Sequence, residues 1–296
     1  MTSLDIVIPT FNAPADRLGR VLRSALACDD VGRVIIVDDG SSSSPTAKSL
    51  GLGADSLEKL VVLTQLNAGP SAARNQGLRT ATADFILCVD DDDELIPKGV
   101  AAMVALADRL NAAGAVAARF NVKSLGPNVN SVLKDVPPEW AGRSLPDPAD
   151  VFTPIALFGG SGILVHRRVP AEGIFFDESL QHGEDREFLR RVAGIGKLAV
   201  SAEPALRVAI HEGGTNLSSH SKFPRRIRDH VVVLDRYLDV RSQFHMRSAT
   251  TWLLDAAAKA RVDRESWSIL LAACRKRGWS IPLKARLRRH IRGASA

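Results

Sequence analysis

The sequence predicts an α/β protein, with a mostly parallel β-sheet flanked by helices and a helical extension at the C-terminal end. Short apolar runs alternate with segments of helical periodicity, which is the element order of a parallel sheet. The runs are continuously apolar, as in strands that are buried on both faces. Polar residues follow them directly, at the place where such sheets bind ligands. The 296 residues suffice for one large domain with an extension.

The first half of the chain is predicted from its apolar runs and the breaks between them. Four runs predict strands: residues 4–9, 34–37, 60–63 and 85–89. Asp16 is expected to cap the helix after the first strand, where apolar residues recur at helical spacing. Ser71 follows a Gly-Pro break and is expected to cap the next helix.

The second half is less regular. Residues 122–150 are rich in Pro, Gly and Asn, so we expect an irregular excursion over the surface. The glycine-dense stretch 158–162 lacks the Gly-Lys-Ser/Thr of a Walker loop, and we expect it to bring backbone close to a ligand before a strand at 163–165. Residues 187–192 have a helical pattern, which resumes from Arg225.

Charge is distributed unevenly along the chain. Residues 221–296 contain 18 Lys and Arg against 6 Asp and Glu, whereas residues 1–220 contain 21 against 27. This asymmetry indicates two parts with different roles. No apolar run reaches the roughly 20 residues of a membrane span, and the N-terminus does not resemble a signal peptide. The three cysteines are odd in number, lie far apart and lack the spacing of metal ligands. Together with the absence of a recognisable span or signal peptide, they lead us to expect a protein of the reducing cytoplasm.

Three polar segments are expected to meet at one edge of the sheet, because crossover connections place the carboxyl ends of parallel strands there. They are Pro9-Thr10-Phe11-Asn12, Asp38-Asp39-Gly40 and the acidic run Asp90-Asp91-Asp92-Asp93. In extended backbone, the carboxylates of Asp90 and Asp92 would point to the same side. Mg²⁺ and Mn²⁺ prefer such oxygen ligands together with a diphosphate. The alternative is a solvated acidic turn.

Other residues have both a functional and a structural interpretation. Asp38 and Asp39 could bond a base or ribose, or could simply form a turn. Arg74, at a helix start, could favour an anion. Glu184-Asp185 could supply a general base or only complement a helix dipole. His211 could bind metal or diphosphate, or be an ordinary loop histidine.

Five motifs, in this order and approximate spacing, resemble glycosyltransferase family 2, which has the GT-A fold. They are VIPTFN, VDDGSSS, NAGPSAARNQGL, CVDDDDELIP and GEDREFL. The resemblance covers about residues 4 to 215. It implies a catalytic domain over 1–220, with a nucleotide-sugar half (1–120) and an acceptor half (121–220), followed by a basic helical region at 221–296.

The resemblance also implies roles for individual residues. The nucleotide-sugar would be bound by Pro9, Thr10, Phe11, Asn12, Asp38 or Asp39, Arg74, Asp90 and Asp91. Asp92 would be the main ligand of Mn²⁺ or Mg²⁺, with Asp90 and His211 beside it. Asp185, next to Glu184, would be the catalytic base. Asp91 stands where Ser or Ala is common, which leaves open which carboxylates hold the metal, and Arg186 replaces an aromatic residue, which favours an anionic or otherwise polar acceptor.

The implied function is transfer of a sugar from a nucleotide-diphosphate sugar, most commonly a UDP-sugar, to an acceptor hydroxyl with inversion. The alternatives are an inactive nucleotide-sugar-binding or scaffolding protein and a nucleotidyltransferase. The first would not need both acidic motifs, and the second would need a Gly-rich loop with Arg and Lys after the first strand. The basic stripe at 282–292 could dock on anionic lipid at the inner face of the membrane or pack its leucines on the catalytic domain. Nucleic acid binding is not expected, because no aromatic residues are interleaved with its basic residues.

Overall fold

The computed structural model describes most of the chain. The described residues are 2–46, 49–51, 53, 57–122, 131–152, 161–209, 223–260, 262–281 and 285. Contacts divide them into two compact units, and each unit is described by itself. The first unit contains the residues up to 148 together with 161–179 and 184–209, and the second contains 149–152, 180–183 and the residues from 223 onward.

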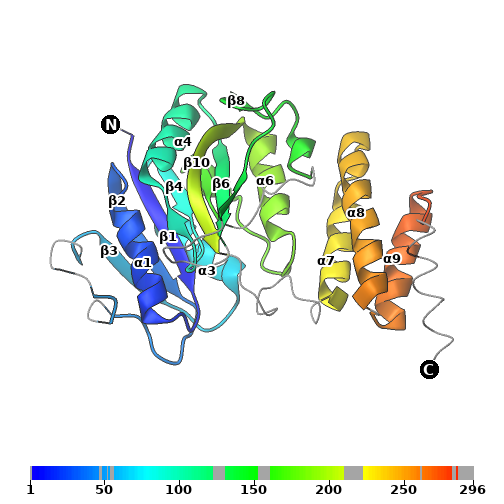
Figure 1. The fold of residues 1–296 in the computed structure, drawn as a ribbon, viewed down its shortest axis with the longest axis horizontal. Coiled ribbons are helices and arrows are strands. Elements are labelled where there is room, and N and C mark those ends of the chain that lie inside the picture. The colour runs from blue at the N-terminus through cyan, green and yellow to red at the C-terminus, as the bar shows by residue number, and fades with distance from the viewer. Residues whose placement is uncertain are drawn as a thin grey trace. The chain divides into compact units, whose positions relative to one another are not determined.

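Ten strands among the described residues form one mixed sheet in the first unit (Figure 1). They are β1 (Leu4–Thr10), β2 (Val31–Asp38), β3 (Leu60–Thr64), β4 (Phe85–Cys88), β5 (Glu94–Leu95), β6 (Gly114–Val122), β7 (Ser131–Lys134), β8 (Arg143–Ser144), β9 (Ile163–His166) and β10 (Leu198–Ala209). The order is β3-β2-β1-β4-β9-β6-β10-β5, with β7 beside β6 and β8 beside β10. β3, β2, β1 and β4 are parallel, as are β6 and β10, and β9 runs antiparallel between β4 and β6. The predicted fold class is confirmed.

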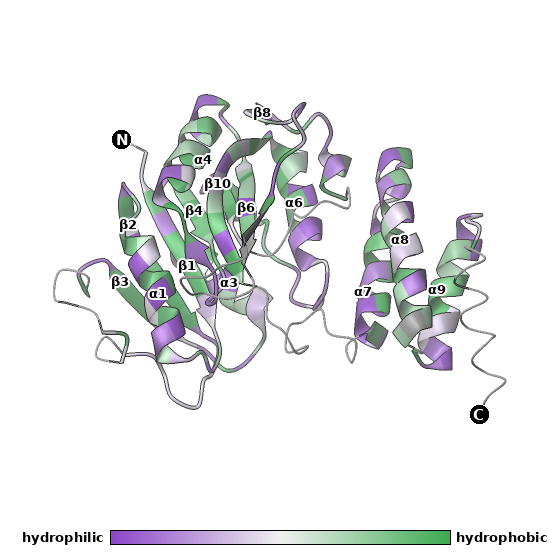
Figure 2. Cartoon of the chain, in the orientation of Figure 1, coloured by the Kyte–Doolittle hydropathy of each residue, from purple (hydrophilic) through white to green (hydrophobic). Residues whose placement is uncertain are grey.

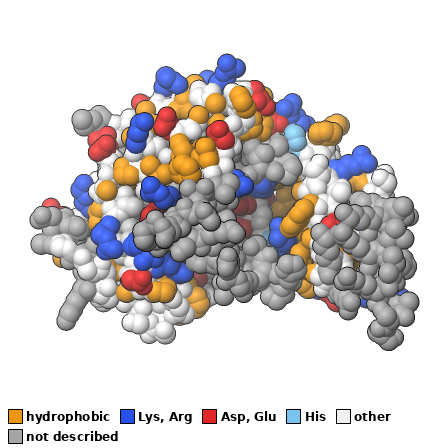
Figure 3. Space-filling view, in the orientation of Figure 1, with side chains coloured by type: hydrophobic (Ala, Val, Ile, Leu, Met, Phe, Trp, Pro, Cys, Tyr) orange, Lys and Arg blue, Asp and Glu red, His pale blue; other side chains and the backbone are white. Residues whose placement is uncertain are grey.

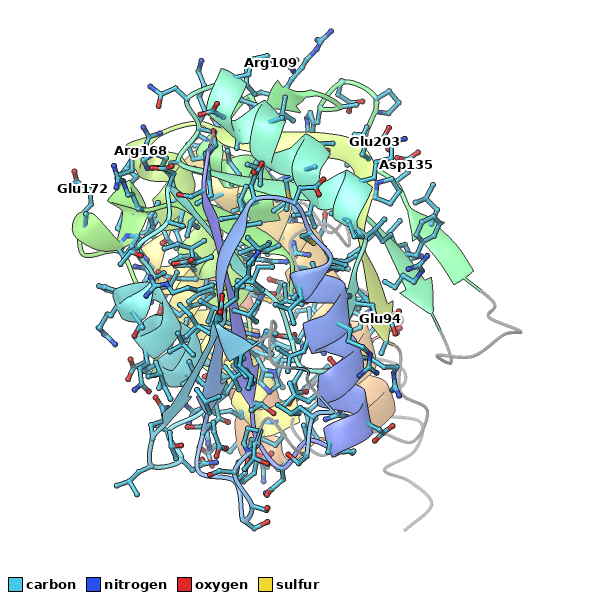
Figure 4. All side chains as sticks on the ribbon, turned by 90° about the vertical axis from the view of Figure 1, so that its left-hand side faces the viewer. Glu94, Arg109, Asp135, Arg168, Glu172 and Glu203 are labelled. Carbon is cyan, nitrogen blue, oxygen red and sulfur yellow. The ribbon has the colours of Figure 1, made fainter. Side chains whose placement is uncertain are left out.

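Helices cover both faces of this sheet, and strand alternation determines which side chains they meet. The helices are α1 (Ala15–Leu26), α3 (Pro70–Thr80), α4 (Pro97–Arg109), the short α5 (Arg168–Ala171) and α6 (Glu184–Ile195), and a 3₁₀ turn spans Pro148–Phe152. Ile6 and Ile8 pack in the core with α1 and α4, whereas Val7 between them faces Gly77 of α3. α1 and α4 lie on one side of the sheet and α3 on the other (Figure 4). The strands carry the hydrophobic colouring in Figure 2.

Both predicted helix caps are wrong. Pro14 precedes α1, and the exposed Asp16 instead pairs with Arg20 at 3.0 Å within the helix. The residue before α3 is Gly69, with φ of 92°, and Pro70 is the first helical residue. Glycine reaches this backbone conformation without a Cβ clash, and proline is preset for the first helical position. Ser71 therefore lies one residue inside the helix, buried at its start.

The second unit contains the helices α7 (Phe223–Arg236), α8 (Val240–Ala260) and α9 (Arg264–Lys276). Their buried face includes Phe223, Leu254 and Leu270. Hydrophobic side chains also reach the visible surface of the molecule (Figure 3), and in this unit Leu238, Val240 and Phe244 are exposed. No helix among the described residues is long and apolar enough to cross a membrane. The basic stripe at 282–292 lies outside the described residues, and the domain boundary at residue 220 stays a prediction.

Candidate functional site

The carboxyl ends of β1, β2 and β3 meet at one edge of the sheet. The Asp39 N–H donates to the Thr10 carbonyl at 2.8 Å, and the Gln65 N–H donates to the Asp38 carbonyl at 2.9 Å. The Asn12 side chain accepts from the Ser42 N–H at 2.9 Å. The loops after these strands are therefore bonded to one another, as the sheet topology predicts, and Pro9 and Phe11 lie among them with the Phe11 ring 50% exposed.

Asp38 and Asp39 are buried and fasten these loops. Asp38 accepts from the Ser41 N–H at 3.0 Å and the Ser44 hydroxyl at 2.7 Å. Burial would raise the pKa of Asp38, but these hydrogen bonds outweigh it and lower the pKa below its ordinary value. Asp39 accepts from Gln65 at 2.7 Å and from the N–H groups of residues 68 and 69 at 2.8 Å each. Both carboxylates thus serve as turn-formers, whatever else they bind.

Asp91 points away from the other acids of its run. Its Oδ2 accepts from the Thr10 hydroxyl at 2.7 Å, and its Oδ1 lies 3.2 Å from Arg17 Nη2. Burial raises the pKa of Asp91, although Thr10 and Arg17 oppose the shift. Arg17 was not predicted, since nothing in the sequence distinguishes it from a surface arginine on an amphipathic helix.

Asp90, Asp92 and Asp93 form the acidic cluster of the site. A turn closed by the Asp93 N–H and the Asp90 carbonyl at 3.2 Å replaces the extended backbone that we expected at 90–92. One carboxylate oxygen from each of the three residues lies within 4.8 Å of the others. Asp93 is 2% exposed, and burial, together with the charges of Asp90 and Asp92, raises its pKa well above the usual value. The cluster therefore consists of Asp90, Asp92 and Asp93, with Asp91 outside it.

Neighbouring elements hold this turn in place. Asp93 accepts from the Ala209 N–H at 2.9 Å, at the end of β10. The Asp90 N–H donates to the Ser161 hydroxyl at 3.1 Å. Glu94, which follows the cluster, lies beside α1 in Figure 4, with its carboxylate 3.8 Å from Arg20. Asp93 was missed as a site residue, whereas Ser161 belongs to the glycine-dense stretch that we expected close to a ligand. Residues 158–160 of that stretch lie outside the described residues.

Arg74 lies between the acidic cluster and the start of α6. Its guanidinium is 5% exposed, with Nη2 2.6 Å from an oxygen of Asp90 and Nη1 3.6 Å from an oxygen of Glu184. Burial alone would lower the pKa of Arg74, but Asp90 and Glu184 raise it, so the side chain stays charged. Arg74 is thus buried between two carboxylates, and its expected place near the base or diphosphate of a nucleotide-sugar stays a prediction.

Glu184 and Asp185 begin α6 and differ in environment. Glu184 is 7% exposed, and burial together with the charge of Asp185 raises its pKa to about 8 against the opposing effect of Arg74. Asp185 is partly exposed, and its Oδ1 accepts from the Arg186 N–H at 2.7 Å. Arg119 of β6 also interacts electrostatically with Asp185 and Asp93, and burial lowers the pKa of both Arg119 and Arg186. Asp185 is thus a carboxylate beside two partly buried cations.

The structure brings most of the predicted site residues together at this edge. The acidic cluster offers three hard oxygen donors, whose mutual repulsion a divalent cation would relieve. His211 lies outside the described residues. Because Asp90 contacts Arg74, which reaches Glu184, the cluster and the Glu184-Asp185 pair belong to one site.

A family model described as "Glycosyl transferase family 2" matches residues 5–162, more than half of the chain. Succinoglycan biosynthesis protein ExoO of Rhizobium meliloti (strain 1021) is 29% identical over 215 residues, which are 70% of this chain and 60% of that protein. The chain thus covers less than two thirds of the length of this relative.

Solved structures have the same fold. S. aureus TarS 1–349 in complex with UDP-GlcNAc aligns over 97% of this chain and 85% of its own, with a TM-score of 0.67 and 18% identity. The mannosyltransferase PcManGT from Pyrobaculum calidifontis, in complex with GDP-Man and Mn²⁺, aligns over 98% of this chain and 79% of its own, with a TM-score of 0.57 and 17% identity. At these identities the likeness establishes the fold, and the ligands belong to those two proteins.

Proposed function

The chain belongs to glycosyltransferase family 2, and we propose that it is a metal-dependent enzyme that transfers a sugar from a nucleotide-diphosphate sugar to an acceptor hydroxyl. The observation that carries this proposal is the buried bridge from Asp90 through Arg74 to Glu184. It joins an acidic cluster suited to a metal diphosphate with a carboxylate pair suited to proton transfer. A protein that only bound nucleotide-sugar would not need the second element.

Asp92 and Asp90 would hold Mn²⁺ or Mg²⁺, and we add Asp93 as the third carboxylate because its oxygen lies in the same cluster. When bound there, the divalent ion would act as a Lewis acid that offsets the charge of the leaving diphosphate. His211 remains a proposed further ligand. Asp91 would support Thr10 rather than contact the ion, since both of its oxygens face Thr10 and Arg17.

Asp185 would be the general base. It is more exposed than Glu184, which is buried against Arg74. As base, Asp185 would take the proton of the acceptor hydroxyl while that oxygen attacks the anomeric carbon and the nucleoside diphosphate departs from the opposite side. A single base without a separate nucleophile supports inversion. Glu184 would hold Arg74 in place.

The donor would be a UDP-sugar, whose base and ribose would lie among the loops of Pro9, Thr10, Phe11, Asn12 and the Asp38-Asp39 pair. The half-exposed Phe11 ring offers a face for a base to stack on. The acceptor would be anionic, because Arg119 and Arg186 place two partly buried guanidinium groups next to Asp185. Contact of the basic region at 282–292 with the inner face of a membrane stays a proposal.

Nucleotide release from a panel of UDP-, GDP- and dTDP-sugars, with water as the acceptor, tests this function. We expect one donor class to be hydrolysed slowly with Mn²⁺ and not with EDTA. Asp185→Asn should lower that rate by about 10²–10⁴-fold, the usual contribution of a general base, while the Kd for the nucleotide changes little. Release that persists in EDTA, or an unchanged rate in Asp185→Asn, would contradict the metal or the base assignment respectively.

A further inference from the structure

Two consecutive buried residues of α3, Arg74 and Asn75, contact the segments that lead into α6. Arg74 reaches Glu184, the first residue of α6, with a separation of 3.6 Å between Nη1 and Oε1. On its other side Arg74 donates to Asp90 at 2.6 Å. α3 therefore has a charged contact with both the acidic cluster and the helix that begins with Glu184-Asp185.

Asn75 supplies the second connection. Its Oδ1 accepts from the Phe176 N–H at 2.8 Å, and its Nδ2 donates to the Phe176 carbonyl at 2.9 Å and to Glu178 at 2.8 Å. The Phe176 ring stacks on Phe188 of α6, with centroids 3.9 Å apart and planes inclined by 16°. These contacts hold the body of α6 against α3, whereas the first residue of α6 approaches α3 through Arg74.

The guanidinium of Arg74 has hydrogen-bond donors that are not in use. Its Nε and Nη1 atoms are buried and have no hydrogen-bond partner among the described residues. The 3.6 Å to Glu184 is just beyond hydrogen-bond length, so a movement of a few tenths of an ångström would form that bond. Inside a protein, charges this close interact strongly, so a cation on Asp90 would weaken the Arg74–Asp90 attraction. Arg74 would then turn its donors toward Glu184.

We propose that Arg74 is a positioning residue that couples occupation of the acidic cluster to the placement of the first turn of α6, which carries Asp185. The coupling rests on the metal site of the proposed function. Filling the cluster with ion and nucleotide shifts Arg74 from Asp90 toward Glu184 and tightens the turn that holds Asp185.

Hydrogen–deuterium exchange of the peptide covering residues 184–195 tests this coupling, with and without Mn²⁺ plus UDP at concentrations that calorimetry shows to be saturating. In the unmodified chain we expect exchange there to slow by about two- to tenfold, the effect of one net hydrogen bond. Arg74→Met should lose this response. Glu184→Met, which removes the accepting oxygen and keeps the acidic cluster intact, should lose most of it even if Arg74→Met fails to fold.

Arg79→Met is the matched control, because Arg79 lies on the same helix, is exposed, and packs over Phe175 with 4.5 Å to the ring centroid. It should respond like the unmodified chain. Binding of Mn²⁺ and UDP without slower exchange at 184–195 would overturn the coupling and leave the proposed function intact, as would a full response in Glu184→Met. Absence of binding would overturn both.

Discussion

Replacing Gly99 by alanine should destabilise the first unit and weaken its metal site together. Gly99 is the third residue of α4, and a Cβ built on it would lie 1.9 Å from the carbonyl oxygen of Pro204 in β10. An ordinary contact begins near 3.4 Å, so helix and strand would have to separate by about 1.5 Å. The opposing atom is backbone, so no side-chain rotation can relieve the collision.

The expected net cost combines two opposing effects. Overpacking of this kind costs about 1–3 kcal/mol, and a backbone collision belongs at the upper end of that range. Alanine returns at most about 1 kcal/mol of helix propensity. The net loss should therefore be about 2 kcal/mol, which lowers the Tm of a unit of this size by about 5 °C. Because β10 also carries the Ala209 N–H that bonds Asp93, affinity for Mn²⁺ should fall as well.

Thermal unfolding followed by circular dichroism, with Gly194→Ala as control, measures this effect. Gly194 is also a helical glycine, in α6, but its added Cβ meets only the end of the Arg190 side chain at 3.9 Å. Gly194→Ala should stabilise the protein by about 0.5–1 kcal/mol. If Gly99→Ala were as stable as Gly194→Ala, the close packing of α4 on β10 would be wrong.

Two further predictions concern single charged groups. Asp93→Asn should leave the stability unchanged or improved, because it relieves repulsion at a buried carboxyl, yet it should weaken Mn²⁺ binding at least about tenfold in calorimetry. Asp91→Asn, outside the cluster, should change the Kd for Mn²⁺ by less than about threefold. If Asp91→Asn weakened Mn²⁺ binding more than Asp93→Asn, the cluster assignment would be refuted. His230 donates to the Thr250 hydroxyl at 2.8 Å, which itself donates to the Met246 carbonyl, and burial, with Arg226 and Arg277, lowers the His230 pKa to about 4. Because the pKa of His230 is lower in the folded state, the folded protein favours the neutral imidazole. Its contribution to the free energy of unfolding is therefore complete above pH 6.5, and about 3 kcal/mol is lost as the pH falls toward 4. Unfolding followed by tryptophan fluorescence, to which Trp252, Trp267 and Trp279 of the second unit contribute beside Trp140, should show this loss in the unmodified chain and not in His230→Gln. Equal acid sensitivity of the two proteins would refute it.

The strands that were predicted correctly share one property, which is a continuous apolar run. Those runs correspond to β1 to β4 and to β9, and α6 was recognised from its periodicity. β6 and β10 were not predicted. β6 is rich in alanine, which is a poor strand former, and β10 contains Pro204, which suggests a loop. The register shift between Ser201 and Leu206 accommodates that proline, and sequence periodicity does not reveal such a shift.

The sequence predicted which residues lie together at this edge of the sheet better than it predicted how they are arranged. Asp90 and Asp92 were chosen from spacing in an extended chain, whereas the turn at 90–93 brings Asp93 into the cluster and sends Asp91 to Thr10. The direction of a carboxylate in a turn depends on hydrogen bonds with distant residues, here those that the Asp93 carboxyl makes with the Ala209 N–H and the Ser161 side chain. The burial of Arg74 likewise depends on packing against Phe176, 101 residues beyond its neighbour Asn75.

In the proposed function, the acidic cluster binds a nucleotide diphosphate through a divalent ion. Isothermal titration of UDP, GDP and dTDP, each with Mn²⁺ and with EDTA, tests it most directly in the unmodified chain and in Asp92→Ala. We predict that one nucleotide, UDP, binds only when Mn²⁺ is present, and that Asp92→Ala abolishes this binding. Binding of the same strength in EDTA, or no binding of any of the three nucleotides, would show that the acidic cluster is not a metal-dependent diphosphate site.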